Sequence, residues 1–162
     1  MKTRIFTTLA ILCFGISVAV HAQTVYDAAT QDLYKLYPDM RNSENAFYRA
    51  YAAEAARLKQ TNPDFFNNPA WPLLIAKSLL PPPQRISYRV AQALDGGALC
   101  QILGQGGQRV YIYGINALDD DKGEAVVYPA GTFGGNTVAA GYKKYPAYAT
   151  SAAIAVTKRN GD

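Results

Sequence analysis

The stretch Asp95-Gly96-Gly97-Ala98-Leu99-Cys100-Gln101-Ile102-Leu103 marks a change of hydrophobic period along the chain. Before it, apolar residues recur at the three- and four-residue spacings of amphipathic helices, and after Gly97 they approach the alternation of strands. Segregation of helical and strand patterns into two halves predicts an α+β fold. We expect N-terminal helices over about residues 24–94, packed on one face of a mostly antiparallel C-terminal sheet over about residues 98–157.

Four helices are predicted in the first half of this pattern. Their ranges are 24–37, 44–59, 68–80 and 84–94. Ser43 offers a cap for the second helix, and Pro81-Pro82-Pro83 separates the third from the fourth. The third helix is apolar almost all round, which is typical of a helix that is buried or covered by a partner.

Four strands are predicted in the second half. Their ranges are 98–103, 109–115, 124–130 and 151–157. The glycines of segment 104–107 suit a hairpin turn between the first two strands. Within Val110-Tyr111-Ile112-Tyr113 the aliphatic and tyrosine side chains alternate, so the tyrosines are expected on a second, partly exposed face. Segments 131–136 and 140–148 are expected to be loops.

The first 22 residues have the order of a secretory signal peptide. Met1-Lys2-Thr3-Arg4 is a short positive segment, and the apolar run from Ile5 to Val20 is shorter than the about 20 residues of a membrane span. Val20-His21-Ala22 then places small residues at the two positions that a signal peptidase reads. We expect cleavage after Ala22, which leaves residues 23–162 as one periplasmic or secreted domain without a transmembrane segment.

Loss of the signal peptide would leave one cysteine, Cys100, and no histidine. The remaining chain could then form no internal disulfide, no Ser-His-Asp or Cys-His catalytic centre and no histidine-based zinc site. No cofactor is indicated. Removal of Lys2 and Arg4 would lower the net charge from +4 to +2, which argues against a nucleic-acid partner.

Two local motifs have both a structural and a functional interpretation. Cys100 lies in an apolar strand and is expected to be an inert buried thiol, although an unpaired cysteine in an exported chain could also form an intermolecular disulfide. Asp119, Asp121 and Gly123 have the Asp-x-Asp-x-Gly spacing of some calcium loops. Because the complete EF-hand pattern is absent, a solvated hairpin tip is the favoured interpretation, and calcium binding is left open.

Carboxylate pairs could in principle hydrolyse a glycan. The only glutamates are Glu44, Glu54 and Glu124, and the first two point in different directions on one predicted helix. Nothing in the sequence indicates the apolar surroundings that a general acid needs.

The densest basic and aromatic cluster after the signal peptide lies in segment 141–148. Its candidate partner-binding residues are Tyr142, Lys143, Lys144, Tyr145 and Tyr148. Tyrosines and cations are common at recognition surfaces, although an ordinary loop with tyrosines against the sheet would have the same composition.

These observations favour a small exported binding protein without catalytic activity. An inhibitor, an immunity protein or an accessory protein of the cell envelope would fit, with another envelope or secreted protein as the partner. The alternatives are a carboxylate-dependent envelope hydrolase and a glycan-binding or structural envelope module.

Overall fold

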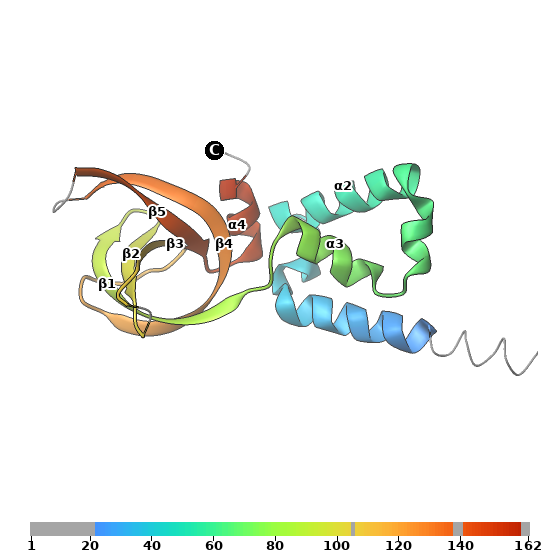
Figure 1. Ribbon diagram of the computed structural model, residues 1–162, viewed down its shortest axis with the longest axis horizontal. Coiled ribbons are helices and arrows are strands. Elements are labelled where there is room, and N and C mark those ends of the chain that lie inside the picture. Colours follow the sequence, from blue (N-terminus) through green and yellow to red (C-terminus); the bar gives the residue numbers. More distant parts are fainter. Residues whose placement is uncertain (1–21, 105, 138–140, 160–162) are drawn as a thin grey trace, which may run out of the picture.

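The computed structural model describes residues 22–104, 106–137 and 141–159 (Figure 1). A layer of helices comes first, a five-stranded barrel follows, and a short helix lies between the two in space. The predicted α+β class, with helices preceding the sheet, is therefore confirmed. The predicted signal peptide lies outside the described residues, except for Ala22. None of the described helices combines the length and apolar character needed to cross a bilayer.

The helical layer contains three α-helices and two 3₁₀ turns. They are a helix over residues 22–36, η1 (Pro38–Arg41), α2 (Ala46–Thr61), η2 (Pro63–Asn67) and α3 (Trp71–Leu79). The cap of α2 is Asn45 rather than the predicted Ser43, since its side-chain oxygen accepts a hydrogen bond from the backbone N–H of Tyr48 at 2.8 Å. The apolar helix α3 buries Ile75 and Ala76, whereas Leu74 stays 40% exposed.

The prediction of a fourth helix over 84–94 was wrong, because this segment is strand β1 (Gln84–Leu94). Ile86, Tyr88 and Val90 are buried, while Arg85 and Arg89 on either side are exposed, which is a strand alternation. The same stretch also shows a four-residue spacing from Ile86 to Val90 to Leu94. Pairing of β1 with strands on both sides decides between the two periods.

The strands form a closed barrel in the order β1-β2-β3-β5-β4. The other strands are β2 (Gly97–Ile102), β3 (Arg109–Tyr113), β4 (Lys122–Thr137) and β5 (Gly141–Ala149). Neighbours are antiparallel except β3 and β5, which are parallel. Because β4 returns to lie beside β1, the first four strands form a Greek key. Segment 114–121 therefore crosses from β3 to β4 and is not the predicted hairpin tip.

Helix α4 (Ala152–Arg159) replaces the strand predicted over 151–157. Its buried residues, Ala152, Ala155 and Val156, have the three- and four-residue spacing of a helix, which short alternating alanines concealed. The Ser151 hydroxyl accepts a hydrogen bond from the backbone N–H of Ile154 at 3.2 Å and caps the first turn. The predicted loops over 131–136 and 140–148 were also wrong, since most of these residues belong to β4 and β5.

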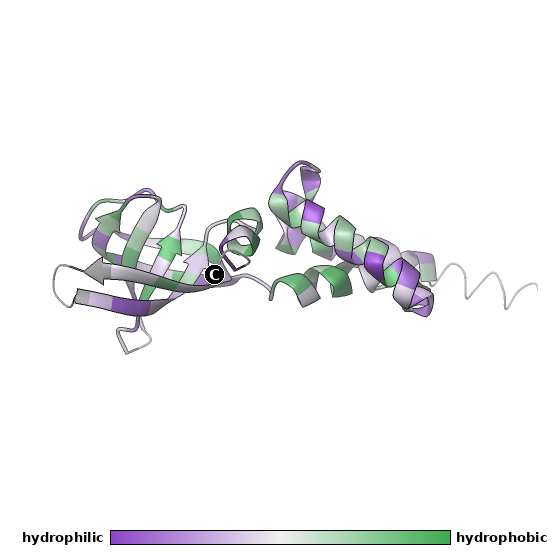
Figure 2. Cartoon of the chain, turned by 90° about the horizontal axis from the view of Figure 1, so that it is seen from above, coloured by the Kyte–Doolittle hydropathy of each residue, from purple (hydrophilic) through white to green (hydrophobic). Residues whose placement is uncertain are grey.

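Two apolar cores hold the molecule together. One fills the barrel, where the inward side chains of β1 to β4 meet around Val90, Cys100 and Ile112. The other lies between the helices and the outer surface of β4 and β5, and it includes Tyr37 and Tyr128. Figure 2 shows mostly apolar residues on α3 and α4 and polar residues on the far part of the β4–β5 hairpin.

Among the described residues, hydrogen bonds join the first helix and η1 to β4, to α4 and to the end of α3, and the Arg159 guanidinium of α4 donates to the carbonyl of Leu79 at 3.2 Å. The hydroxyl of Tyr128 on β4 donates to the carbonyl of Leu36 at 2.7 Å. The backbone N–H of Ala153 on α4 donates to the Asp39 carboxylate at 2.8 Å, although 114 residues separate them. The Tyr37 hydroxyl donates to the carbonyl of Leu80 at 2.7 Å. Bonds of this kind satisfy buried polar groups and fix the position of β4 and α4 against the helices.

Candidate functional site: the β4–β5 ribbon

The far part of the β4–β5 hairpin extends beyond the strands that flank it. The pairing of β1 with β4 reaches only Val127, and the pairing of β3 with β5 begins only at Ala147. Residues 132–137 and 141–146 consequently pair only with each other among the described strands, and we call them the ribbon. Figure 1 shows the ribbon running to the end of the barrel that lies farthest from the helices.

A bulge at the base of the ribbon decides which side chains face outward. Tyr128 pairs with Ala149, whereas Thr132 pairs with Pro146, so β4 contains one residue more than β5 between these pairs. Gly131 in this bulge has a φ of 83°, a backbone conformation that favours glycine. The extra residue reverses the alternation of β4. As a result, Phe133 lies on the same outer face as Tyr128.

The two faces of the ribbon carry different side chains. Lys143 lies opposite Gly135 and shares the outer face with Phe133 and Tyr145. Lys144 lies opposite Gly134 on the other face, which it shares with Tyr142. The rings of Phe133 and Tyr142 occupy the space where Gly135 and Gly134, respectively, would carry a Cβ atom. Each aromatic ring therefore covers a glycine on its own face.

The five candidate residues lie on one strand, but they differ in exposure. Tyr142 is 66% exposed, and both lysines are also exposed. Tyr145 is only 6% exposed, and Tyr148 is half-buried against the barrel core. Tyr145 and Tyr148 therefore contribute to packing. Direct contact with a partner is open to Tyr142, Lys143 and Lys144.

An aromatic cluster continues the outer face of the ribbon toward α4. Phe133 stacks on Tyr111 with the ring centroids 3.8 Å apart and the planes 11° apart. Tyr113 stands nearly perpendicular to Phe133, at 78° and 6.1 Å. The Nζ atom of Lys158 on α4 lies 4.9 Å from the centre of the Tyr113 ring, within the range of a cation–π interaction. We call Phe133, Tyr113, Lys158 and Lys143 the aromatic corner.

Sequence reasoning missed Phe133, Tyr113 and Lys158 as members of one surface. Phe133 lies in a segment expected to be a loop, and Lys158 follows a segment expected to be a strand. Tyr113 was expected on a partly exposed face, which agrees with its half-buried position. The bulge in β4 and the helical geometry of α4 bring the three together; the helical spacing of Ala152, Ala155 and Val156 was the one available signal for α4, and no spacing in the sequence signals the bulge.

The stretch of sequence that forms the ribbon and α4 carries only positive side-chain charges. No Asp or Glu occurs between Glu124 and Asp162, whereas Lys143, Lys144, Lys158 and Arg159 lie in that stretch. The ion pairs found among the described residues join Arg57 to Glu54, Arg85 to Glu124 and Arg89 to Asp120, and they involve none of these four cations. The surface formed by the ribbon and α4 therefore attracts anions.

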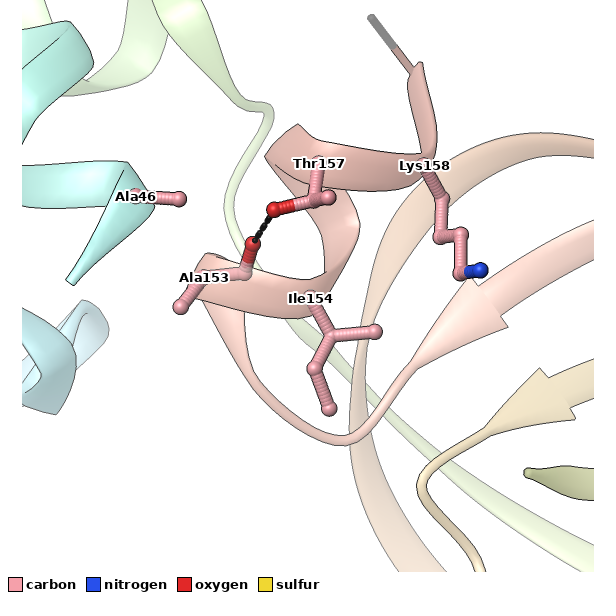
Figure 3. A pocket seen from close by; sticks show the side chains of 5 residues that line it. All are labelled: Ala46, Ala153, Ile154, Thr157 and Lys158. Atoms are coloured by element: carbon pink, nitrogen blue, oxygen red, sulfur yellow. Dashed lines mark hydrogen bonds between the residues drawn. The ribbon is translucent and has the colours of Figure 1, made fainter. Parts of the chain in front are cut away.

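A small apolar pocket lies between the start of α2 and helix α4 (Figure 3). Its volume is about 260 Å³, and it is lined by Ala46, Ala153, Ile154, Thr157 and Lys158. The Thr157 hydroxyl donates to the carbonyl of Ala153 at 2.9 Å, and the Lys158 side chain runs toward the barrel. Because its polar groups are already engaged elsewhere, the pocket has little with which to orient a ligand.

The acidic loop uses its carboxylates within the fold. Asp119 accepts a hydrogen bond from the backbone N–H of Ala93 at 2.6 Å, and Asp121 accepts one from Leu118 at 2.8 Å. Gly123 lies against the Tyr88 ring, where a side chain would not fit. Among the described residues, no group of three or more His, Cys, Asp or Glu is placed to hold a metal ion.

The remaining catalytic candidates have structural partners. Burial raises the pKa of the Cys100 thiol to about 12, so this thiol is poorly suited to form a thiolate, and its predicted burial is confirmed. Glu54 forms a bidentate pair with Arg57 at 2.6 and 2.7 Å, and this hydrogen bonding lowers its pKa. Glu124 is exposed beside Arg85. Neither glutamate lies in the apolar surroundings that a general acid requires.

Comparisons with known proteins give no match, since no family model, no curated protein and no solved structure matches the chain.

Proposed function

We propose that this chain is a small exported binding protein without catalytic activity, and that it binds another envelope or secreted protein through the ribbon. The observation that supports this most is the position of the ribbon. It extends past its neighbouring strands and presents Tyr142, Lys143 and Lys144 to solvent in a stretch of sequence that contains no Asp or Glu between Glu124 and Asp162.

Physical chemistry gives each part of the ribbon a role in recognition. Exposed lysines attract an acidic partner and accelerate encounter with it. An exposed tyrosine adds a large contact area with a polar end. The outer edges of the two strands have backbone groups without a neighbouring strand, which another chain can pair with. Inhibitors, immunity proteins and accessory subunits all require a contact of this kind.

Edge lysines also have a purely protective role, because they discourage non-specific strand pairing. The two roles predict different effects of charge reversal. If the lysines are only protective, Lys143→Glu with Lys144→Glu would leave the capture of a specific partner unchanged.

The test is affinity capture from an envelope extract with purified protein. The wild-type chain should retain a partner that the Lys143→Glu, Lys144→Glu double variant loses. The matched control is Lys35→Glu with Lys59→Glu, which makes the same charge change on exposed helical positions away from the barrel. Equal capture by the ribbon variant and the control variant would refute the proposal.

A further inference from the structure

The aromatic corner has the features of a ligand site that is separate from Tyr142 and Lys144 on the other face of the ribbon. Tyr111, only 1% exposed, covers one side of the Phe133 ring. Phe133 itself is only partly buried: it packs against the core between the helices and the outer surface of β4 and β5, and the rest of its side chain reaches solvent. Tyr113 rises from this floor at 78° as a wall. The result is an angular apolar surface built on two strands of the barrel and held from below by a buried ring.

Two ammonium groups flank this surface from different elements. Lys158 is held over the Tyr113 ring by α4, with its Nζ atom 4.9 Å from the ring centre. Lys143 extends from β5 on the same face as Phe133, opposite the glycine that the Phe133 ring covers. Neither lysine belongs to an ion pair found among the described residues, and the nearby acidic residue Asp95 contacts the site from below, where its backbone carbonyl accepts a hydrogen bond from the Tyr111 hydroxyl at 3.2 Å.

We propose that the aromatic corner binds a sugar ring that carries an anionic group, as a unit of an acidic glycan. A flat aromatic face offers close van der Waals contact to the C–H side of a sugar ring, and a perpendicular wall limits its orientation. The two ammonium groups form charge-assisted hydrogen bonds with a carboxylate or sulfate on the ring. This inference does not require the proposed protein partner: the two sites share Lys143, but Phe133, Tyr113 and Lys158 belong to the aromatic corner alone, and Tyr142 and Lys144 lie on the opposite face of the ribbon.

Strand alternation supplies a matched control within the chain. Lys143 and Lys144 are neighbours in sequence and both are exposed, but only Lys143 shares the face of Phe133. If binding depends only on general positive charge, substitution of either lysine should weaken it equally. If binding depends on the aromatic corner, substitution of Lys143 should weaken it and substitution of Lys144 should not.

The experiment is a calorimetric titration of the full chain with an oligogalacturonate, which carries a carboxylate on each sugar. A neutral oligosaccharide of equal length and a sulfated oligosaccharide are the comparison ligands. We expect the acidic oligomers to bind and the neutral one to bind at least about tenfold more weakly. Preference between carboxylate and sulfate identifies the anionic group.

The variants then locate the site. Lys143→Gln and Lys158→Gln should each weaken binding by about tenfold, whereas Lys144→Gln should stay within about twofold of wild type. Phe133→Leu, which removes the flat ring, should also weaken binding. If it melts below wild type, the Lys158→Gln result decides the question alone.

Three results would overturn the inference: no binding of either acidic oligomer, equal binding of the neutral oligomer, or equal losses from Lys143→Gln and Lys144→Gln. Capture of the protein partner tests the proposed function separately from the titration with sugars. Retained capture by a protein that binds no acidic sugar would refute only this inference, and the converse would refute only the proposed function.

Discussion

The two ends of the β4–β5 hairpin are built from the same strands but have opposite surroundings. At its base, β4 and β5 pair with β1 and β3 and pack against α4, and Val127, Tyr128 and Ala149 are buried. In the ribbon the strands pair only with each other, and their lysines are exposed. The base of the hairpin therefore stabilises the fold, whereas the exposed side chains of the ribbon can be substituted with little effect on folding.

The chemistry of the side chains follows the same division. Ala147, Ala149 and Ala152 at the base are small, so α4 can approach the strands closely. The ribbon contains three glycines and two exposed lysines, and its buried contacts are limited to side chains such as Phe133, which stacks on Tyr111, and Tyr145. We therefore expect substitutions at the base to change stability and substitutions in the ribbon to change binding.

The largest expected difference is between two tyrosines of this hairpin. Tyr128 is 4% exposed and donates a hydrogen bond to Leu36, whereas Tyr142 is 66% exposed. Tyr128→Ala should lower the free energy of unfolding by about 3–5 kcal/mol, and Tyr142→Ala by no more than about 0.5 kcal/mol. Urea denaturation measures both. Similar losses would mean that base and ribbon do not differ in their contribution to the fold.

The next largest effect is expected from high pH, which should lower the stability that Tyr128 contributes at the base of the β4–β5 hairpin. Burial, followed by the effect of nearby Asp39, raises the pKa of Tyr128 from its ordinary 10.0 to about 12. The unfolded chain therefore releases this proton first as the pH rises. The stabilisation is fully present below pH 10 and is lost as the pH rises through 12, a change of up to about 2.7 kcal/mol.

The test compares wild type with Tyr128→Phe in denaturation experiments from about pH 9 to about pH 12. The variant should be less stable at the lower pH, because it lacks the hydrogen bond to Leu36, and should lose less stability as the pH rises. A decline as steep as that of wild type would show that Tyr128 does not titrate as expected.

A smaller effect is expected at the junction of α4 with the helical layer. Asp39→Ala removes the carboxylate that accepts from the N–H of Ala153 and should cost about 1 kcal/mol, as for other lost helix caps. Asp32→Ala, at an exposed position of the helix over residues 22–36, should cost less than about 0.5 kcal/mol. Thermal melts would detect the difference, and indistinguishable variants would argue against a stabilising role for this cap.

The sequence predicted that helices precede the sheet, but it assigned the wrong element type to the segments of β1, β5, α4 and the second half of β4. Long amphipathic or apolar segments such as α2 and α3 were identified because their period is clear over many residues. Gln84–Leu94 was assigned to a helix because Ile86, Val90 and Leu94 fit a four-residue spacing, and only pairing with β2 and β4 resolves the ambiguity. Barrel closure likewise depends on contacts between distant strands.

The candidate residues were chosen from a segment that was expected to be a loop and is strand β5, and their three-dimensional setting was not predicted. Composition alone identified the lysines and tyrosines of segment 141–148. The burial of Tyr145, the outward position of Phe133 and the approach of Lys158 depend on the bulge at Gly131 and on α4. A local pattern does not encode these relations, because each involves residues from separate elements.

The central claim is that the exposed side chains of the ribbon serve recognition and contribute little to stability. Its most direct test is the association rate of the captured partner with wild type and with the Lys143→Glu, Lys144→Glu variant, measured over a range of salt concentrations and alongside thermal melts. The account predicts an unchanged melting temperature, slower association and a weaker dependence on salt for the variant. A normal melt together with wild-type association at every salt concentration would contradict it.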